Sequence, residues 1–133
     1  VMWKERSTKR ILDIQKRIDL AIFGLGRIDA EVPSQVYAAG YLGTSEIESL
    51  NKERVVGDIA TVFFREDGSW NDIELNQRSS GPGLDQLKKA ARRVCVTSGV
   101  AKIEALRGAL AGGFITDLFI DDLTAEKLLE TAS

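Results

Sequence analysis

Three short apolar runs in the chain each end in small or acidic residues. Runs of this length are typical of parallel strands that are buried on both faces of a sheet. Ligands of such sheets bind outside the carboxyl ends of the strands, so these residues predict one binding edge. The runs and the residues after them are 18–23 before Gly24-Leu25-Gly26, 94–96 before Thr97-Ser98-Gly99, and 118–120 before Asp121-Asp122.

Apolar residues at helical spacing alternate with these strands and predict the helices. A capping box of Ser45 and Glu48 opens one of them, and Asp122 caps the last. The alternation predicts right-handed βαβ units and an α/β sheet. The predicted helices cover 7–16, 45–53, 84–91, the stripe from Val100 to Leu110, and the segment after Asp122.

The centre of the chain departs from this alternation. Residues 59–64 are rich in β-branched and aromatic side chains and predict a strand. Asp67-Gly68 is a hairpin turn signal, so 69–75 is expected to return as an edge strand. The predicted fold class is therefore α/β, a mainly parallel sheet flanked by helices with a central β-hairpin.

Length and charge limit the classes of function. The 133 residues, of which 44% are hydrophobic, predict one globular domain over 1–133. The 18 basic and 20 acidic residues leave a formal net charge of −2, which gives no basic surface for nucleic acid and no attraction to an anionic membrane. No apolar stretch reaches the roughly 20 residues of a membrane-spanning helix.

The chain has one cysteine and no histidine. Cys95 lies in an apolar run and is expected in the core, since no histidine is present to act as its base. The missing histidine also excludes histidine metal ligands and a Ser/His/Asp triad, so no metal or cofactor is expected. A reducing, cytoplasmic location fits, and the charged first ten residues do not form a signal peptide. Because the chain begins at Val1, we expect it to be a piece of a longer protein.

The segment Ser98-Gly99-Val100-Ala101-Lys102 is the first candidate site. A helix N-terminus presents N–H groups and partial positive charge, against which Lys102 is unfavourable unless an anion binds there. Ser98 adds a hydroxyl, and Gly99 lets the backbone approach a ligand closely. The alternative is a capped helix with a solvated lysine.

The first half of the chain contains three further candidate ligand-binding residues, two glycines and an acid. Gly24 and Gly26 suit a turn beside a ligand, but they also suit a simple turn, since Asp29 stands where the third glycine of a dinucleotide motif belongs. Asp58 lies where a carboxylate can grip hydroxyl groups of a ligand, and it can equally be an ordinary residue at a strand entry.

Two further charged residues complete the candidates. Asp121 precedes the predicted cap of the last helix and is a candidate for the binding edge. Arg78 lies in a loop over 76–78, from which it can reach a phosphate or a partner subunit.

Seven short segments occur in an order that is known from one family of proteins. They are 19–26, 39–42, 56–59, Phe63-Phe64 with Asp67-Gly68, 75–78, 98–102, and 121–129 with Thr124-Ala125 and Leu128-Leu129. Together they resemble the C-terminal sugar-binding (effector) domain of the SorC/DeoR-type bacterial transcriptional regulators. The resemblance extends over nearly the whole chain.

The resemblance implies a fold similar to sugar-phosphate isomerases and glucosamine-6-phosphate deaminase. It implies a domain that binds a phosphorylated sugar and modulates DNA binding and oligomerisation. It places the family's effector-gripping acid on Asp58, its ligand-contacting lysine on Lys102, and its glycine turn on Gly24 and Gly26. It further implies that 1–133 is the later part of the effector domain, incomplete on its N-terminal side, and that DNA is contacted only through a missing helix-turn-helix domain.

Two alternatives stay open at this point. An isomerase or deaminase of similar fold would use Asp58 as general base and Lys102 to hold phosphate, but Arg27-Ile28-Asp29 stands where such deaminases carry an aspartate-glycine-histidine run. A structural fragment with an incomplete site would only mediate assembly. We expect a regulator domain without catalysis, whose partners are a phosphorylated sugar and further copies of the chain.

Overall fold

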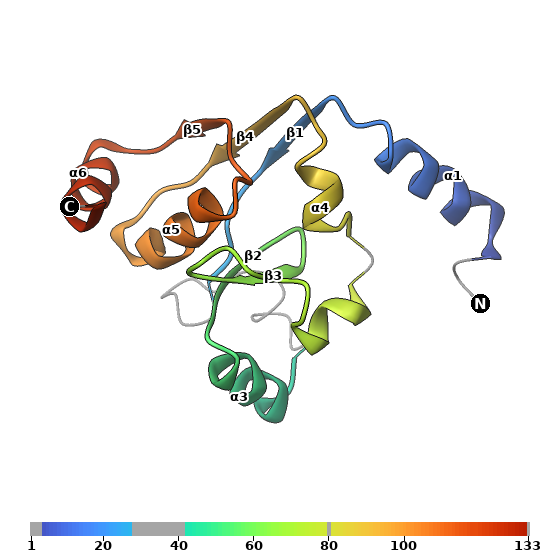
Figure 1. Cartoon of the computed structure of the whole chain (residues 1–133), viewed down its shortest axis with the longest axis horizontal. Helices are drawn as coiled ribbons and strands as arrows, with labels where there is room; N and C mark the ends of the chain where they lie inside the picture. Colours follow the sequence, from blue (N-terminus) through green and yellow to red (C-terminus); the bar gives the residue numbers. More distant parts are fainter. Residues whose placement is uncertain (1–3, 28–41, 80, 133) are drawn as a thin grey trace.

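The computed structural model describes residues 4–27, 42–79 and 81–132. The elements lie in one mixed α/β arrangement (Figure 1). Helices and strands are α1 Arg6–Gln15, β1 Leu20–Phe23, α3 Thr44–Lys52, β2 Val55–Ile59, β3 Val62–Arg65, α4 Leu84–Leu87, β4 Arg92–Val96, α5 Ile103–Ala111, β5 Asp117–Phe119 and α6 Asp122–Ala132. Two 3₁₀ helices, η2 Glu74–Arg78 and η3 Val100–Lys102, complete the set.

A three-stranded parallel sheet is the frame of the fold, with the strand order β1-β4-β5. Leu20 lies opposite Arg92, and Val94 lies opposite Asp117, so β4 is paired on both sides. The crossover from β4 to β5 runs through α5. The predicted fold class, a parallel sheet flanked by helices with a hairpin, is confirmed.

The hairpin of β2 and β3 turns at a different place from the predicted one. The turn residues are Ala60 and Thr61, with φ of 48° and 69°. Both angles lie in the left-handed region that two-residue hairpin turns of the I′ type require. The Asp58 carboxylate accepts the Thr61 N–H at 3.3 Å and helps to hold this turn. Neither alanine nor threonine signals such a turn, which is why the prediction missed it.

The returning strand predicted over 69–75 is wrong. The Asn76 side chain occupies the free edge of β3, because its Oδ1 accepts the Phe63 N–H at 2.7 Å and its Nδ2 donates to the Phe63 carbonyl at 2.9 Å. A side-chain amide therefore replaces a strand. Asp67-Gly68 does form a local turn, in which the Asp67 carboxylate accepts the Ser69 N–H at 2.9 Å.

Two predicted helix caps are shifted along the chain. Helix α3 begins at Thr44, and the Glu46 carboxylate accepts the Gly43 N–H at 2.5 Å, so the predicted box of Ser45 and Glu48 is wrong. At α6 the cap is Asp121 and not Asp122: the Asp121 carboxylate accepts the Thr124 N–H at 3.2 Å. Asp121 and Asp122 are both suitable N-cap residues, so the sequence alone does not show at which of them the helix begins.

The core lies between the sheet, α5 and the hairpin. Phe64 and Phe114 are buried and meet edge to face, with ring centroids 5.8 Å apart. Gly108 lets α5 lie directly on the hairpin, since a Cβ there would be 2.5 Å from the Arg65 carbonyl oxygen. Cys95 is a buried free thiol, as predicted. Burial raises its pKa to about 11, a shift that the nearby Lys102 charge opposes.

The opposite face of the sheet is bare in the described part of the chain. Figure 1 shows α4, α5 and the hairpin on one side of the strands, with α1 extending away from the rest. Four apolar side chains on the other side are half exposed or more: Leu20 52%, Ile22 69%, Val96 55% and Phe119 60%. Parallel sheets are normally covered on both faces, so this face offers a surface for association.

Replacing Gly108 by alanine is expected to destabilise the fold by about 1–3 kcal/mol, the cost of overpacking a rigid contact. This holds although alanine is intrinsically favoured over glycine in a helix interior by about 1 kcal/mol. Urea unfolding measures the change. Gly24→Ala is the matched control, since its methyl would lie 3.6 Å from the nearest atom, an ordinary contact. Equal stability of Gly108→Ala and wild type would contradict the packing described for α5.

Candidate functional site

The loop that follows β1 lies against strand β2. Gly26 follows β1 and forms an isolated antiparallel bridge with Asp58. The Gly26 N–H donates to the Asp58 carbonyl at 3.0 Å, and the Asp58 N–H donates to the Gly26 carbonyl at 3.2 Å. This close approach depends on Gly57, where a Cβ would lie 2.5 Å from the Gly26 oxygen. The glycine turn and the acid, separate in sequence, are therefore neighbours.

Lys102 joins the same place from the second half of the chain. It is the last residue of η3, directly before α5. Its ammonium group donates to the Leu25 carbonyl at 2.9 Å, and the lysine is half-buried. The carbonyl lies inside the Gly24–Gly26 turn. The structure therefore brings together four of the predicted site residues: Gly24, Gly26, Asp58 and Lys102.

Asp58 is a buried acid, with 5% of its surface exposed. Burial of a carboxylate is costly unless hydrogen bonds compensate it, and Oδ2 accepts the Thr61 N–H. Asp58 lies next to last in β2 rather than at the strand's entry. The carboxylate thus holds the hairpin turn while its backbone holds the glycine loop.

Ser98 and Gly99 are held by a second cluster, built on Asp121 and Thr124. The Asp121 carboxylate accepts the Ser98 hydroxyl at 3.1 Å and the Gly99 N–H at 3.4 Å. The Thr124 hydroxyl accepts the same Gly99 N–H at 3.0 Å and donates to Asp121. Gly99 has φ of 110°, which an L side chain rarely adopts. These bonds fix the loop that leads into η3 and α5.

The Asp121 carboxylate therefore accepts hydrogen bonds from Ser98, Gly99 and Thr124, and these bonds position the Ser98-Gly99 loop. The Thr124 hydroxyl first of all, and then the backbone N–H groups of Thr124 and Gly99, lower the pKa of Asp121 to about 2. The sequence argument missed Thr124. Its position three residues after an acid at a helix start is the signal that identifies such a partner.

Arg78 lies apart from these contacts. At the end of η2 its guanidinium forms an ion pair with Glu46 at 2.5 Å, and its side chain is 63% exposed. This hydrogen bond lowers the pKa of Glu46 below its ordinary value. The predicted loop over 76–78 is thus part of a 3₁₀ helix, and the hydroxyl of the next residue, Ser79, is 2.7 Å from the Thr61 hydroxyl, so the end of η2 adjoins the hairpin turn that Asp58 holds.

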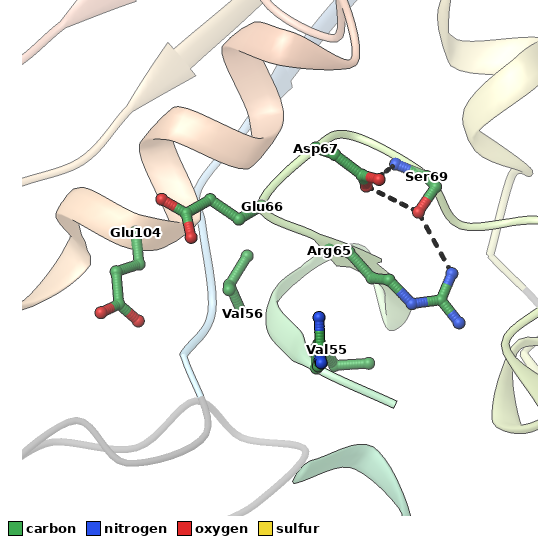
Figure 2. A pocket seen from close by; sticks show the side chains of 8 residues that line it. Val55, Val56, Arg65, Glu66, Asp67, Ser69 and Glu104 are labelled. Atoms are coloured by element: carbon green, nitrogen blue, oxygen red, sulfur yellow. Dashed lines mark hydrogen bonds between the residues drawn. The ribbon is translucent and has the colours of Figure 1, made fainter. Parts of the chain in front are cut away.

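A groove of about 650 Å³ lies elsewhere on the hairpin (Figure 2). None of the predicted site residues lines it. Figure 2 shows Arg65 directed toward Ser69, away from Glu66 and Glu104. Arg65 is already paired with Asp72 at 2.6 Å and with Glu53 at 3.4 Å. Because the Arg65 guanidinium is already paired within the fold, it is not a good candidate to bind a ligand in this groove.

The described ranges 4–27, 42–79 and 81–132 contain neither a cluster of metal-binding side chains nor a membrane-spanning helix. Among these residues no group of three or more acids and cysteines gathers as metal ligands would. None of the helices there has the length and apolar character of a membrane span.

Comparisons with known proteins decide the family. The family model "Putative sugar-binding domain" matches residues 1–130. The chain belongs to this family of sugar-binding domains. The resemblance predicted from the seven sequence segments is thereby confirmed.

Relatives of the domain are bacterial transcriptional regulators. The chain is 32% identical to the Deoxyribonucleoside regulator of Bacillus subtilis (strain 168) over 126 residues, which covers 95% of this chain and 39% of that protein. A crystal structure of a domain of a possible sugar-binding transcriptional regulator from Arthrobacter aurescens TC1 superposes with a TM-score of 0.87 at 49% identity, covering 96% of this chain and 48% of that one. The full-length Sorbitol Operon Regulator SorC from Klebsiella pneumoniae superposes with a TM-score of 0.84 at 25% identity, covering 96% and 40%.

The sugar-binding domain spans about two fifths of the curated relatives it matches and about half of the chain of one solved domain. Since these relatives are regulators, the expectation that the domain is not an enzyme agrees with them, and the isomerase or deaminase alternative finds no support.

The Asp121 carboxylate is expected to make stability depend on pH. Its pKa of about 2 lies below its ordinary value of 3.8, so its contribution is present above about pH 4 and is lost as the pH falls toward 2. Asp121→Asn should lower the urea midpoint at pH 6 and lose part of the decline that wild type shows between pH 5 and pH 2.

Asp122→Asn is the matched control, because the Asp122 carboxylate accepts the N–H of its own helix neighbour Leu123. It should keep the wild-type dependence on pH. If Asp121→Asn and wild type lost stability in parallel over this range, Asp121 would not hold the loop as described.

Proposed function

We propose that this chain binds a phosphorylated sugar and acts as the effector-sensing part of a transcriptional regulator. Binding would alter the DNA affinity of a helix-turn-helix domain outside these 133 residues. The observation that carries the proposal is the junction of Lys102 with the Gly24–Gly26 turn, beside the buried Asp58. It supplies a cation for a phosphate and an acid for hydroxyl groups at one edge of the sheet.

Lys102 and Asp58 would recognise different groups of the ligand. Lys102 lies at the N-terminal end of the helical segment formed by η3 and α5, where the helix dipole also favours an anion. Its ammonium group donates to the neutral Leu25 carbonyl, and a phosphate would be a better partner for its charge. Asp58 accepts hydrogen bonds that sugar hydroxyl groups donate. A ligand with both groups, a sugar phosphate, uses both residues.

The remaining predicted residues have supporting roles in this proposal. Ser98 and Gly99 shape the loop next to Lys102, and Asp121 holds that loop from α6. Arg78 is a peripheral cation that an incoming phosphate would have to take from Glu46. We also place the protein in the cytoplasm, because a regulator of transcription acts where the DNA is.

We further propose that the chain associates with a second copy of itself. The bare face of the sheet supplies the surface, with Leu20, Ile22, Val96 and Phe119 exposed in one layer. Strand β1 is an edge strand of this sheet, and an apolar cavity of about 250 Å³ lined by Ile18, Pro82 and Leu87, among others, runs beside it. An exposed apolar face next to an open strand edge is a surface that is stabilised when another protein covers it. A second copy of the chain is a partner that is always present.

The ligand proposal is tested by thermal shift and calorimetry on a panel of sugars. The panel takes its sugars from the words deoxyribonucleoside and sorbitol in the relatives' names: deoxyribose and sorbitol are each tested with and without a phosphate, beside inorganic phosphate alone. One sugar phosphate should stabilise the protein selectively. Lys102→Ala should weaken its binding by about 1.5–3 kcal/mol, the loss of a hydrogen bond to a charged group.

Two variants separate the roles at the site. Asp58→Asn should weaken binding of the sugar phosphate and leave the weak binding of inorganic phosphate unchanged. Lys127→Ala, which removes an exposed lysine of α6 paired with Glu130, is the control and should bind as wild type does. Absence of any phosphate-dependent stabilisation across the panel would refute this ligand class.

The association proposal is tested by light scattering coupled to size-exclusion chromatography. The chain should elute as a dimer or larger, and Ile22→Lys should shift it to the monomer, because the lysine charge cannot be buried cheaply in an apolar interface. Ile11→Lys on α1, at a residue that is also exposed, should leave the assembly unchanged. A wild-type monomer at high micromolar concentration would overturn the proposal.

A further inference from the structure

The end of β4 carries a buried hydroxyl that the fold does not use. Thr97 follows β4 directly and has 8% of its surface exposed. Its backbone N–H donates to the Phe119 carbonyl at 3.1 Å, but its side-chain Oγ1 has no hydrogen-bond partner in the part of the chain that the structure describes. A buried polar group that is left unpaired has lost its hydrogen bonds to water without replacing them. A threonine here is therefore unfavourable for stability alone.

Thr97 differs in this respect from Arg93, which also has a buried side-chain atom without a partner among the described residues. Arg93 leaves its Nε without a partner, yet its guanidinium still donates through Nη1 to the carbonyls of Lys88 at 3.0 Å and Ala90 at 2.7 Å. The arginine is thus anchored by the fold. The threonine has only one polar side-chain group, and the whole of it is unpaired.

The strand's alternation places this hydroxyl on the side of the candidate site. Successive residues of a strand point to opposite faces. Val96 is on the bare face with 55% of its surface exposed, so Thr97 lies on the same side as Cys95, which is buried in the core with residues of α5. Lys102 is close enough to Cys95 for its charge to affect the thiol pKa. Thr97 thus belongs to the side of β4 from which Lys102 extends.

The loops around Thr97 are those already assigned to the ligand. Thr97 immediately precedes Ser98 and Gly99, whose loop leads into η3 and Lys102. On the β1 side, a Cβ built at Gly24 would lie 3.6 Å from the carbonyl of Val96, the residue before Thr97. The threonine is therefore at the point where the glycine turn, the serine loop and the lysine converge.

We propose that the Thr97 hydroxyl is a ligand-contacting and specificity-determining group, which hydrogen-bonds an oxygen of the bound sugar phosphate. This inference rests on the proposed function of the site. A hydroxyl can both donate and accept, so either a sugar hydroxyl or a phosphate oxygen satisfies it. Binding then removes the cost that the unliganded fold carries. A site with such a group also discriminates against ligands that lack the matching oxygen, because the buried hydroxyl would again be left unpaired.

The test compares Thr97→Val with Thr97→Ser in the 133-residue protein. Valine keeps the shape of threonine and removes the hydroxyl, whereas serine keeps the hydroxyl. Without ligand, Thr97→Val should melt at the same temperature as wild type or higher. Calorimetry with whichever sugar phosphate of the panel stabilises wild type should show a dissociation constant raised about tenfold or more by Thr97→Val and less than threefold by Thr97→Ser.

The outcomes separate this inference from the proposed function. If wild type binds a sugar phosphate, Lys102→Ala weakens that binding and Thr97→Val does not, the role of Thr97 is refuted and the function stands. If Thr97→Val alone lowers the melting temperature of the unliganded protein by several degrees, its hydroxyl serves the fold and the inference is overturned whatever the ligand does. If wild type binds no sugar phosphate of the panel, both proposals fall together.

Discussion

The pair of backbone hydrogen bonds between Gly26 and Asp58 is the contact on which the rest of this domain depends. It connects two separate sheets, the parallel sheet through the end of β1 and the antiparallel hairpin through β2. The contact exists because position 57 has no side chain, since a Cβ there would overlap both the Gly26 oxygen and the Ala105 methyl. The same glycine thus sets the distance of the hairpin from α5 and from the glycine loop, whose Leu25 carbonyl Lys102 contacts.

Much of the frame could be predicted from the sequence because it depends on burial. Short apolar runs specify the strands of the parallel sheet, and the apolar stripe from Val100 to Leu110 specifies the helix between β4 and β5. The failures share a different cause. The hairpin turn at Ala60 and Thr61 adopts left-handed angles without a glycine or asparagine, and a carboxylate from Asp58 holds it. At the edge of β3 the Asn76 side-chain amide makes the hydrogen bonds that a neighbouring strand would make. The hydrophobic periodicity of the sequence gives no sign of this arrangement.

The sequence proposed the residues of the candidate site one by one, but it did not predict the contacts that connect them. Strand ends placed Gly24, Gly26 and Ser98 at one edge, and the family resemblance added weight to Asp58 and Lys102. The reach of Lys102 to the Leu25 carbonyl depends on the path of η3 and on a side-chain rotamer, which one sequence does not reveal. That Asp121 lies near the ligand stays a prediction, and the structure adds that its carboxylate holds the serine loop to α6.

The tethers of the site span long stretches of the chain. Lys102 and the residue it contacts are 77 positions apart, and Gly99 and Asp121 are 22 apart. Bringing residues together across such long loops costs chain entropy. Contacts of this kind are therefore expected to form with the completed fold and not ahead of it. The candidate binding edge is consequently a property of the whole domain. A cut of the chain between Leu25 and Lys102 would leave the contact between these two residues to be held by packing alone, because no covalent path through the intervening chain would then join them.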